Sequence, residues 1–371
     1  MRITLFFTRG TSLADWERGG SFDRETSLYL RFRELGHEPA FITYGGKGEL
    51  AFGPRLGGIE IRRNPSRVPL NFYEWLIPFF HGKTLVRSDI IKSNQTYGAE
   101  IALRAARMAK KPFVARCGFM FSEFEARAHG PDSELAREAR EVEQKVFTRA
   151  DRIIVTTPMM RDNIADRFPR AESRIAVIPN FVRTDMFAPL PDQAEKEYDA
   201  VFVGRMVEQK NPAALLRAAS DLGIRLLMIG TGPLLEELKR EYVSDRIEWL
   251  DKVDHADLPG RIGRARVFVL PSHYEGHPKT LIEAMSCGAC VLAADSPGIR
   301  EVVSHDADGF LCGTSPEDIG RSLKILLESS ELRERLGRAA REKAVREYSL
   351  HRVADRELGL YRKLLAEKHS G

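Results

Sequence analysis

The stretch VFVLPSHYEGHPKTLIEAM, residues 267–285, decides the fold class of this chain. It opens with an apolar run, residues 267–270, that is typical of a buried strand. It closes with a helical apolar pattern at residues 281–285, and a loop joins the two. In open α/β sheets such a junction is where ligands bind, because loops at strand C-termini meet helix N-termini in a crevice.

Two carboxylates, Glu275 and Glu283, bracket this loop with seven residues between them. We expect Glu275 at the mouth of the crevice and Glu283 in the first turns of the helix. There both could hold ligand hydroxyls. The backbone N–H groups between them suit a phosphate, because a helix N-terminus carries unsatisfied donors and a partial positive charge.

Outward from this stretch, strand and helix alternate along the whole chain, which predicts parallel sheets with helices on both faces. Strands are expected at residues 3–7, 40–44, 89–93, 112–115, 153–156, 174–178, 200–203, 225–229, 246–250, 267–270 and 290–293. The expected helices include residues 23–35, 99–109, 133–150, 213–220, 234–242, 317–328, 331–348 and 350–368.

A break rich in proline and charge, residues 179–197, divides the alternation in two. We therefore predict an N-terminal domain at residues 1–182, a C-terminal domain at residues 183–349 and a terminal helix at residues 350–371. This helix has a partial apolar stripe and should dock on the first domain. Its members are Val353, Leu360, Tyr361, Leu364 and Leu365. The expected fold class is α/β, with two doubly wound, Rossmann-like domains facing a central cleft.

The composition is that of a soluble globular protein, with 43% hydrophobic and 30% charged residues. A net charge of +4 is too weak to indicate nucleic acid but is compatible with anionic ligands or membranes. With no targeting or spanning segment recognised and only four cysteines, we expect a cytoplasmic protein. Cys287 and Cys290 form a CxxC that follows a helix instead of opening one, so buried, unreactive thiols are expected.

Two cations follow the first strand of the second domain. Gly204 allows a tight turn, and Arg205 and Lys210 then project from the loop on the ligand side of the sheet. A guanidinium fork and an ammonium point charge together suit a pyrophosphate. The next such turn contains Gly230 and Gly232, which either approach a ligand or only form a tight turn.

A glycine pair, Gly19 and Gly20, is expected between the first strand and the first helix. Bare backbone N–H groups at a helix N-terminus would bind an anion. The alternative is a flexible glycine hairpin.

In this order the motifs resemble the family 4 retaining glycosyltransferases of the two-domain GT-B fold. The resemblance spans roughly residues 200–310, and the first half matches more loosely. The matching residues are Gly204-Arg205, Lys210, Gly230-Thr231-Gly232-Pro233, Pro271-Ser272, Glu275-Gly276, Glu283-Ala284-Met285, Gly288, the run 295–301 and Asp308-Gly309-Phe310.

The resemblance implies roles for these residues. Arg205 and Lys210 would bind the pyrophosphate of a nucleotide-diphosphate sugar, Glu275 the transferred sugar and Glu283 the ribose. The Gly19-Gly20 loop would close on this donor from the other domain. Backbone contacts to phosphates or sugar would come from Gly276, His277, Pro278, Lys279 and Thr280.

The resemblance also implies partners. The acceptor would be a carbohydrate or a lipid-linked glycan, in cell-surface polysaccharide, lipopolysaccharide or glycolipid synthesis. Neither a metal nor another cofactor is expected, which agrees with the lack of an acidic cluster, since Asp199 is a lone carboxylate.

The sequence departs from the family at two places. Many relatives have a histidine followed by a glycine where this chain has Arg116. Arg116 either contacts the donor sugar or the acceptor in place of that histidine, or it is a structural arginine. His277 takes a position that is often apolar, where it touches the sugar or caps the loop. An acid-rich loop at residues 119–125, with Glu123, is expected to shape the acceptor site.

An apolar stretch, residues 71–80, is flanked by Arg67, Lys83 and Arg87. A core helix is the favoured interpretation, and peripheral contact with the inner face of a membrane is the alternative. Two other functions fit the sequence less well. A dinucleotide-dependent oxidoreductase is disfavoured by the lack of GxGxxG after either first strand. A non-catalytic nucleotide-sugar binder is disfavoured by the complete set of site residues.

Overall fold

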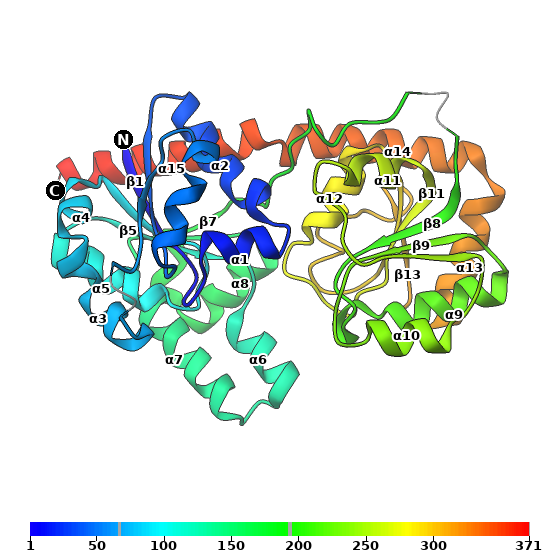
Figure 1. Cartoon of the computed structure of the whole chain (residues 1–371), viewed down its shortest axis with the longest axis horizontal. Helices are drawn as coiled ribbons and strands as arrows, with labels where there is room; N and C mark the ends of the chain where they lie inside the picture. Colours follow the sequence, from blue (N-terminus) through cyan, green and yellow to red (C-terminus); the bar gives the residue numbers. More distant parts are fainter. Residues whose placement is uncertain (66–67, 192–194, 371) are drawn as a thin grey trace. The chain divides into compact units, whose positions relative to one another are not determined.

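The computed structural model describes residues 1–65, 68–191 and 195–370. Its contacts divide the chain into two compact units, one of Met1–Pro179 with the residues from Val353 onward, the other of Asn180–Arg352. Each unit is a parallel β-sheet between helices (Figure 1). Arg67 lies outside the described residues.

The N-terminal unit contains a seven-stranded parallel sheet of order β3-β2-β1-β4-β5-β6-β7. Its strands are β1 (Arg2–Phe6), β2 (Glu38–Ile42), β3 (Glu60–Arg62), β4 (Ile90–Ser93), β5 (Phe113–Cys117), β6 (Arg152–Val155) and β7 (Ile175–Val177). The helices are α1 (Leu13–Arg18), α2 (Phe22–Glu34), α3 (Leu70–Phe80), α4 (Gly82–Arg87), α5 (Ala99–Ala109), α6 (Phe121–His129), α7 (Glu134–Arg149), α8 (Pro158–Arg167) and most of α15 (Leu350–Ser370), with 3-10 turns at Lys47–Leu56 and Pro169–Arg174.

The C-terminal unit contains a six-stranded parallel sheet of order β10-β9-β8-β11-β12-β13. Its strands are β8 (Tyr198–Val203), β9 (Leu226–Ile229), β10 (Ile247–Leu250), β11 (Ala265–Leu270), β12 (Cys290–Ala294) and β13 (Phe310–Cys312). The helices are α9 (Pro212–Leu222), α10 (Leu235–Glu241), α11 (Leu258–Gly263), α12 (Lys279–Ser286), α13 (Pro316–Glu328) and α14 (Ser330–Lys343). A π-helical turn, η4 (Ala344–Tyr348), follows α14, and a 3-10 turn, η3 (Glu208–Lys210), follows β8.

The strand order of each sheet reverses once. The reversal lies between β1 and β4 in the N-terminal unit and between β8 and β11 in the C-terminal unit. Loops on either side of such a switch point leave the sheet in opposite directions, so a crevice opens at the C-terminal ends of the two strands. Each unit therefore has one position that its topology favours for a ligand.

The terminal helix α15 packs on the N-terminal unit, as expected from its apolar stripe. Val353, Leu358, Tyr361 and Leu364 are buried, and the Tyr361 ring meets the Phe32 ring edge-on. Leu360 and Leu365 are only half-buried, so the buried stripe runs through Leu358 instead. None of the helices that the structure describes is both long and apolar enough to cross a bilayer.

Several short elements were not predicted from the sequence, among them β3, β13, α1 and α6. β3 and β13 are each three residues long and only partly buried, and they exist because they pair with β2 and β12. Such short edge strands have no periodicity of their own. α1 begins at a capping box of Ser12 and Asp15, which satisfies its first N–H groups. The expected helix at 331–348 is also divided, since α14 ends at Lys343 and η4 follows.

The four cysteines are buried and unpaired, as predicted. Burial raises the pKa of Cys287 and of Cys290 to about 12. The thiolate that redox or metal chemistry needs is therefore scarce at neutral pH.

Candidate functional site

The loops after β8 and β11 are joined to each other at the switch point of the C-terminal unit. The His273 N–H donates to the Gln209 carbonyl at 2.9 Å, and Gln209 Nε2 donates to the Tyr274 carbonyl at 2.7 Å. Asn211 Nδ2 adds a bond of 3.3 Å to the Pro271 carbonyl. These bonds hold the two loops as one surface, so side chains from both are fixed relative to each other.

Lys210 and Glu275 form a direct ion pair across these loops. Their side chains are only 14% and 8% exposed. The sequence analysis placed Lys210 on the phosphates and Glu275 on the sugar, and the structure brings the two together although 65 residues separate them. The pair keeps both side chains at the switch point and compensates their charges.

Arg205 differs from Lys210, because its side chain is exposed and has no hydrogen-bond or ion-pair partner among the described residues. It therefore supplies an uncompensated positive charge beside the switch point. A guanidinium in this state can bind a phosphate through two parallel N–H bonds.

The loop that carries Glu275 leads into the N-terminus of α12. Pro278 precedes the helix, and no side chain caps its first turn. Such an end carries a partial positive charge from the aligned peptide dipoles, and anions bind there. Lys279 and Thr280 lie in this turn, half-exposed, so the helix begins two residues before the apolar pattern that predicted it.

His277 is held inside the unit. Its carbonyl accepts a hydrogen bond of 2.7 Å from Asn180 Nδ2, and its ring packs edge-on against Tyr348 at 5.3 Å. Of the two interpretations left open, these contacts favour the one in which His277 fixes the loop. Asn180 was not among the predicted site residues, and the structure makes it a support of this loop.

Glu283 is 2% exposed, and its Oε1 lies 3.0 Å from Nε2 of His255. This histidine follows β10 and its ring also contacts Phe187. The ribose contact of Glu283 stays a prediction, and any hydroxyl that reaches it meets a carboxylate oriented by His255. No sequence signal pointed to His255, because it stands 28 residues from its partner in a loop without a motif.

The glycines of the neighbouring turns allow backbones to approach closely. A Cβ on Gly230 would lie 2.0 Å from the Gly204 carbonyl oxygen, and one on Gly232 would lie 2.4 Å from that of Met206. The turns after β8 and β9 therefore pack directly on each other. Gly298, which was not among the predicted site residues, packs closely on the backbone of Glu275. A Cβ added to Gly298 would lie 2.2 Å from the Glu275 carbonyl oxygen.

The Gly19-Gly20 pair was placed wrongly by the sequence analysis. It lies between α1 and α2, and it ends α1 instead of beginning the first helix. The Gly20 N–H donates to Glu17, the Ser21 N–H donates to Trp16, and Gly20 has a φ of 65°. This is a Schellman cap, which uses the N–H groups that were expected to face an anion. The contact of this loop with the donor stays a prediction.

Arg116 is the second-last residue of β5 and half-buried, and its N–H donates to Ser93 Oγ at 3.1 Å. Its charge acts on the buried side chains of Lys92 and Tyr361, so it belongs in part to the interior. Glu123 lies on α6, where a loop was expected, and accepts a bond of 2.7 Å from Asn163 Nδ2. Their roles toward an acceptor stay predictions.

The switch point of the N-terminal unit has polar side chains that the sequence analysis missed. Asn94 Nδ2 donates to Thr8 Oγ1 at 3.2 Å, which joins the loops after β1 and β4. Arg9 lies over the Tyr97 ring at 5.9 Å. Pairing β1 with β4 is what brings these loops together, and the sequence shows neither strand order nor pairing.

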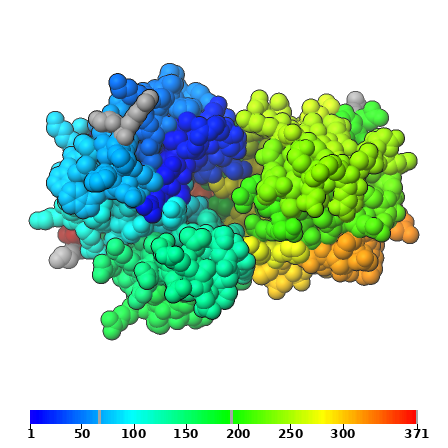
Figure 2. Space-filling view, turned by 60° about the horizontal axis from the view of Figure 1, so that its bottom comes forward, coloured from blue at the N-terminus to red at the C-terminus, as the bar shows by residue number. Residues whose placement is uncertain are grey.

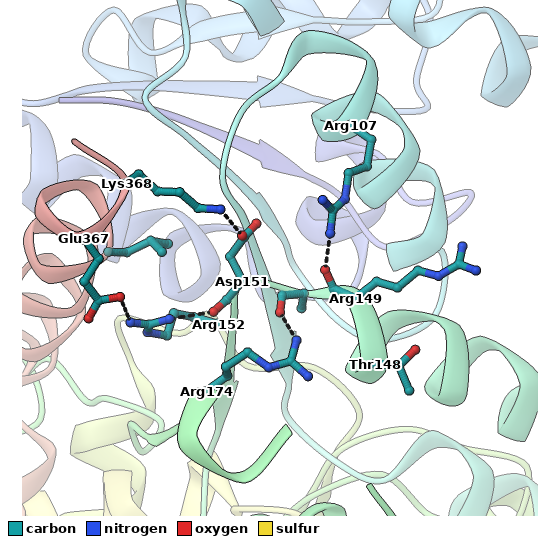
Figure 3. A pocket seen from close by; sticks show the side chains of 10 residues that line it. Arg107, Thr148, Arg149, Asp151, Arg152, Arg174, Glu367 and Lys368 are labelled. Atoms are coloured by element: carbon teal, nitrogen blue, oxygen red, sulfur yellow. Dashed lines mark hydrogen bonds and ion pairs between the residues drawn. The ribbon is translucent and has the colours of Figure 1, made fainter. Parts of the chain in front are cut away.

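A hollow of about 450 Å³ lies at the N-terminal ends of β6 and β7 in the same sheet, away from the switch point (Figure 3). Arg107 and Arg174 there donate to the carbonyls of Arg149 and Ala150 at the end of α7. Lys368 pairs with Asp151 at 2.8 Å. These side chains stabilise the helix end, so the hollow is not part of the switch-point site.

Two Rossmann-like units, each with one switch point, define the GT-B class. The model named Glycosyl transferases group 1 matches residues 189–343, and the model named Glycosyltransferase Family 4 matches residues 26–186. The chain therefore belongs to the family 4 glycosyltransferases.

Its relatives include the alpha-maltose-1-phosphate synthase of Mycolicibacterium smegmatis, 28% identical over 61% of this chain and 66% of that protein. The D-inositol 3-phosphate glycosyltransferase of Salinispora tropica is 28% identical over 61% of this chain and 53% of its own length. The matched part of the chain thus spans less than two thirds of either relative.

Among solved structures, sucrose-phosphate synthase of Thermosynechococcus elongatus superposes with a TM-score of 0.80 at 19% identity, covering 99% of this chain and 100% of that one. Anabaena HepE in complex with UDP has a TM-score of 0.77 at 15% identity, covering 98% and 100%. These structures share the fold of the whole chain.

Proposed function

We propose that this protein transfers a hexosyl unit from a nucleotide-diphosphate sugar to an acceptor hydroxyl, with retention of the anomeric configuration. The observation that carries the proposal is the switch point between β8 and β11. It brings the Lys210–Glu275 pair together with the loop of Arg205 and leads into the uncapped N-terminus of α12. Cations, a hydroxyl-binding carboxylate and helix donors are what a sugar pyrophosphate requires.

In this proposal the cations act on the leaving group. Negative charge grows on the departing diphosphate as the glycosidic bond breaks, so fixed positive charge stabilises the transition state more than the ground state. Glu275 holds the sugar hydroxyls while its bond to Lys210 keeps it oriented. No side chain is assigned as a nucleophile, because retaining transfer on one face of the sugar needs none.

The donor is placed on the C-terminal unit and the acceptor on the N-terminal unit. UDP bound to HepE supports a uridine nucleotide as the first candidate. Relatives named glycogen synthase and alpha-maltose-1-phosphate synthase support glycan synthesis as the setting. We place the enzyme in the cytoplasm, in cell-surface polysaccharide, lipopolysaccharide or glycolipid synthesis.

A thermal-shift screen over UDP, GDP, ADP and their sugars tests the donor. A ligand at one hundred times its Kd should stabilise the protein by about 2.7 kcal/mol, so one nucleotide should raise the melting temperature well above the others. The matching sugar is then incubated with candidate acceptors, and the anomeric coupling of the product is read by NMR. An inverted product, or tight donor binding without turnover, contradicts the proposal.

The proposal needs no metal, since Arg205, Lys210 and the α12 N-terminus supply the positive charge. Transfer should therefore be unchanged after dialysis against EDTA. Loss of activity that Mg²⁺ or Mn²⁺ restores would contradict this part.

A further inference from the structure

The helix α3 has an aromatic face that the N-terminal unit leaves uncovered. Tyr73 and Ile77 are fully buried, whereas Phe72, Trp75 and Phe79 are 66%, 62% and 65% exposed. The spacing of these three residues places them on one side of a helix. Large aromatic side chains that gather on a surface in this way mark an interaction site.

This face is held outward by the contacts of the opposite face. The Glu74 carboxylate accepts a bond of 2.7 Å from Arg9, and its carbonyl accepts a bond from Arg104 on α5. The Tyr73 hydroxyl donates to the Thr43 carbonyl at 3.1 Å and lies 2.8 Å from His81 Nε2. A rotation that buried the aromatic rings would break all of these bonds, so the rings stay exposed in the folded unit.

Positive charge surrounds the aromatic face. α3, α4 and α5 are neighbours (Figure 1), and Lys83, Arg87, Arg104 and Arg107 are all exposed on the last two helices. Arg107 continues this charge into the basic hollow of Figure 3. The carboxylate of α3 itself, that of Glu74, is neutralised by Arg9. The light-blue segment with α3 and α4 forms an outer surface of its unit in Figure 2.

We propose that this face docks on an anionic lipid bilayer, with Phe72, Trp75 and Phe79 among the lipid headgroups and Lys83, Arg87 and Arg104 on the lipid phosphates. Aromatic rings flanked by lysine and arginine are the composition that binds such an interface. A second copy of the chain is disfavoured as the occupant, because two such faces would bring like charges together.

Docking has a consequence for the acceptor, and this consequence rests on the proposed function. The N-terminus of α3 lies beside the loop after β1, since a Cβ on Gly10 would lie 3.9 Å from Leu70 Cδ2. That loop borders the switch point of the N-terminal unit. A bilayer bound at α3 therefore brings lipid-linked glycans close to this site, which makes them the acceptor class.

Vesicle binding by the full chain tests the proposal. Trp75 is the exposed tryptophan of the chain's three, since Trp16 is buried and Trp249 is half-buried. Vesicles of phosphatidylglycerol and phosphatidylcholine should shift its emission to the blue, and brominated lipid should quench it. The W75F variant should lose both signals. Pure phosphatidylcholine should bind about tenfold more weakly or worse, and added salt should weaken binding.

Matched variants locate the surface. F72S/F79S and K83Q/R87Q should each lower vesicle binding about tenfold or more. V243S/I325S and R217Q/K324Q change exposed side chains of the C-terminal unit and should leave binding unchanged. Circular dichroism and the nucleotide-induced thermal shift of each variant verify that it is folded.

Several outcomes overturn docking. These are no binding to vesicles, equal binding to phosphatidylcholine alone, and unchanged binding by F72S/F79S. Self-association without vesicles that F72S/F79S removes would make a second copy of the chain the occupant. The R205A variant separates the two proposals, because it should lose transfer yet still bind vesicles.

Discussion

At the scale of single residues, the two cationic side chains of the candidate site differ in whether a carboxylate already pairs with them. Lys210 is compensated by Glu275, whereas Arg205 is exposed without a partner among the residues described. In the proposed function, a donor would therefore form new interactions at Arg205, whereas at Lys210 it would share the ammonium with the Glu275 carboxylate. We expect Arg205 to contribute most to stabilising the leaving diphosphate.

The R205A variant should lower kcat by about 10²–10³-fold, the usual effect of removing one preorganised transition-state contact. R205K should recover only part of the activity, because an ammonium has no bidentate geometry. Steady-state rates of nucleotide release measure this, with R217A on exposed α9 as the control cation. Turnover of R205A equal to that of the unmodified protein would remove Arg205 from the site.

At the scale of elements, the terminal helix α15 is fastened by a buried ion pair. Lys92 on β4 pairs with Glu357, both fully buried, and the Tyr361 hydroxyl donates to the same carboxylate. Burial lowers the pKa of Lys92 because it disfavours the charged ammonium, and the Glu357 carboxylate beside it opposes this effect. The helix is thus bound by charge as well as by its apolar stripe.

Removing one member of this pair should be strongly destabilising. E357A leaves a buried ammonium and a buried hydroxyl without an acceptor, so the free energy of unfolding should fall by about 3–5 kcal/mol. K92M/E357L/Y361F removes all three polar groups together and should cost far less. Denaturant unfolding compares these variants with E367A, which breaks an exposed pair with Arg152 and should cost about 1 kcal/mol or less.

At the scale of the whole molecule, the N-terminal unit is built from both ends of the chain, while the C-terminal unit is one continuous segment. Each unit has its own core, so unfolding need not follow a single transition. The stability of the N-terminal unit should depend on pH, because it contains His81, a buried histidine with a lowered pKa.

Burial lowers the pKa of His81 from 6.5 to about 4. The unfolded chain therefore takes up a proton below about pH 6.5 that the folded unit refuses until about pH 4, so stability falls as the pH falls through this window. Between pH 7 and pH 4.5 the loss should be about 2–3 kcal/mol. In urea unfolding at both pH values, H81Q should lose less stability than the unmodified chain. An equal loss in both proteins would contradict the assignment.

The sequence alone was sufficient for the larger elements and for the composition of the site. β8, β11 and β12 contain continuous apolar runs, and α5 was predicted with its observed bounds. Both could be predicted because the spacing of apolar residues, and the glycines or prolines that end an element, are local properties of the sequence. The short strands β3 and β13 and the helix α1 were missed, since neighbouring strands or a single cap stabilise them.

By itself, then, the sequence determined two α/β domains and a returning terminal helix, and it named the residues that we propose to bind a sugar pyrophosphate. Only the tertiary structure decided which of them meet. Strand order placed Lys210 against Glu275 and Glu283 against His255, and it turned the aromatic side of α3 outward. The physical reason is that the periodicity of apolar residues is a property of neighbouring residues, whereas charge pairing and exposure depend on strands and helices far apart in the chain.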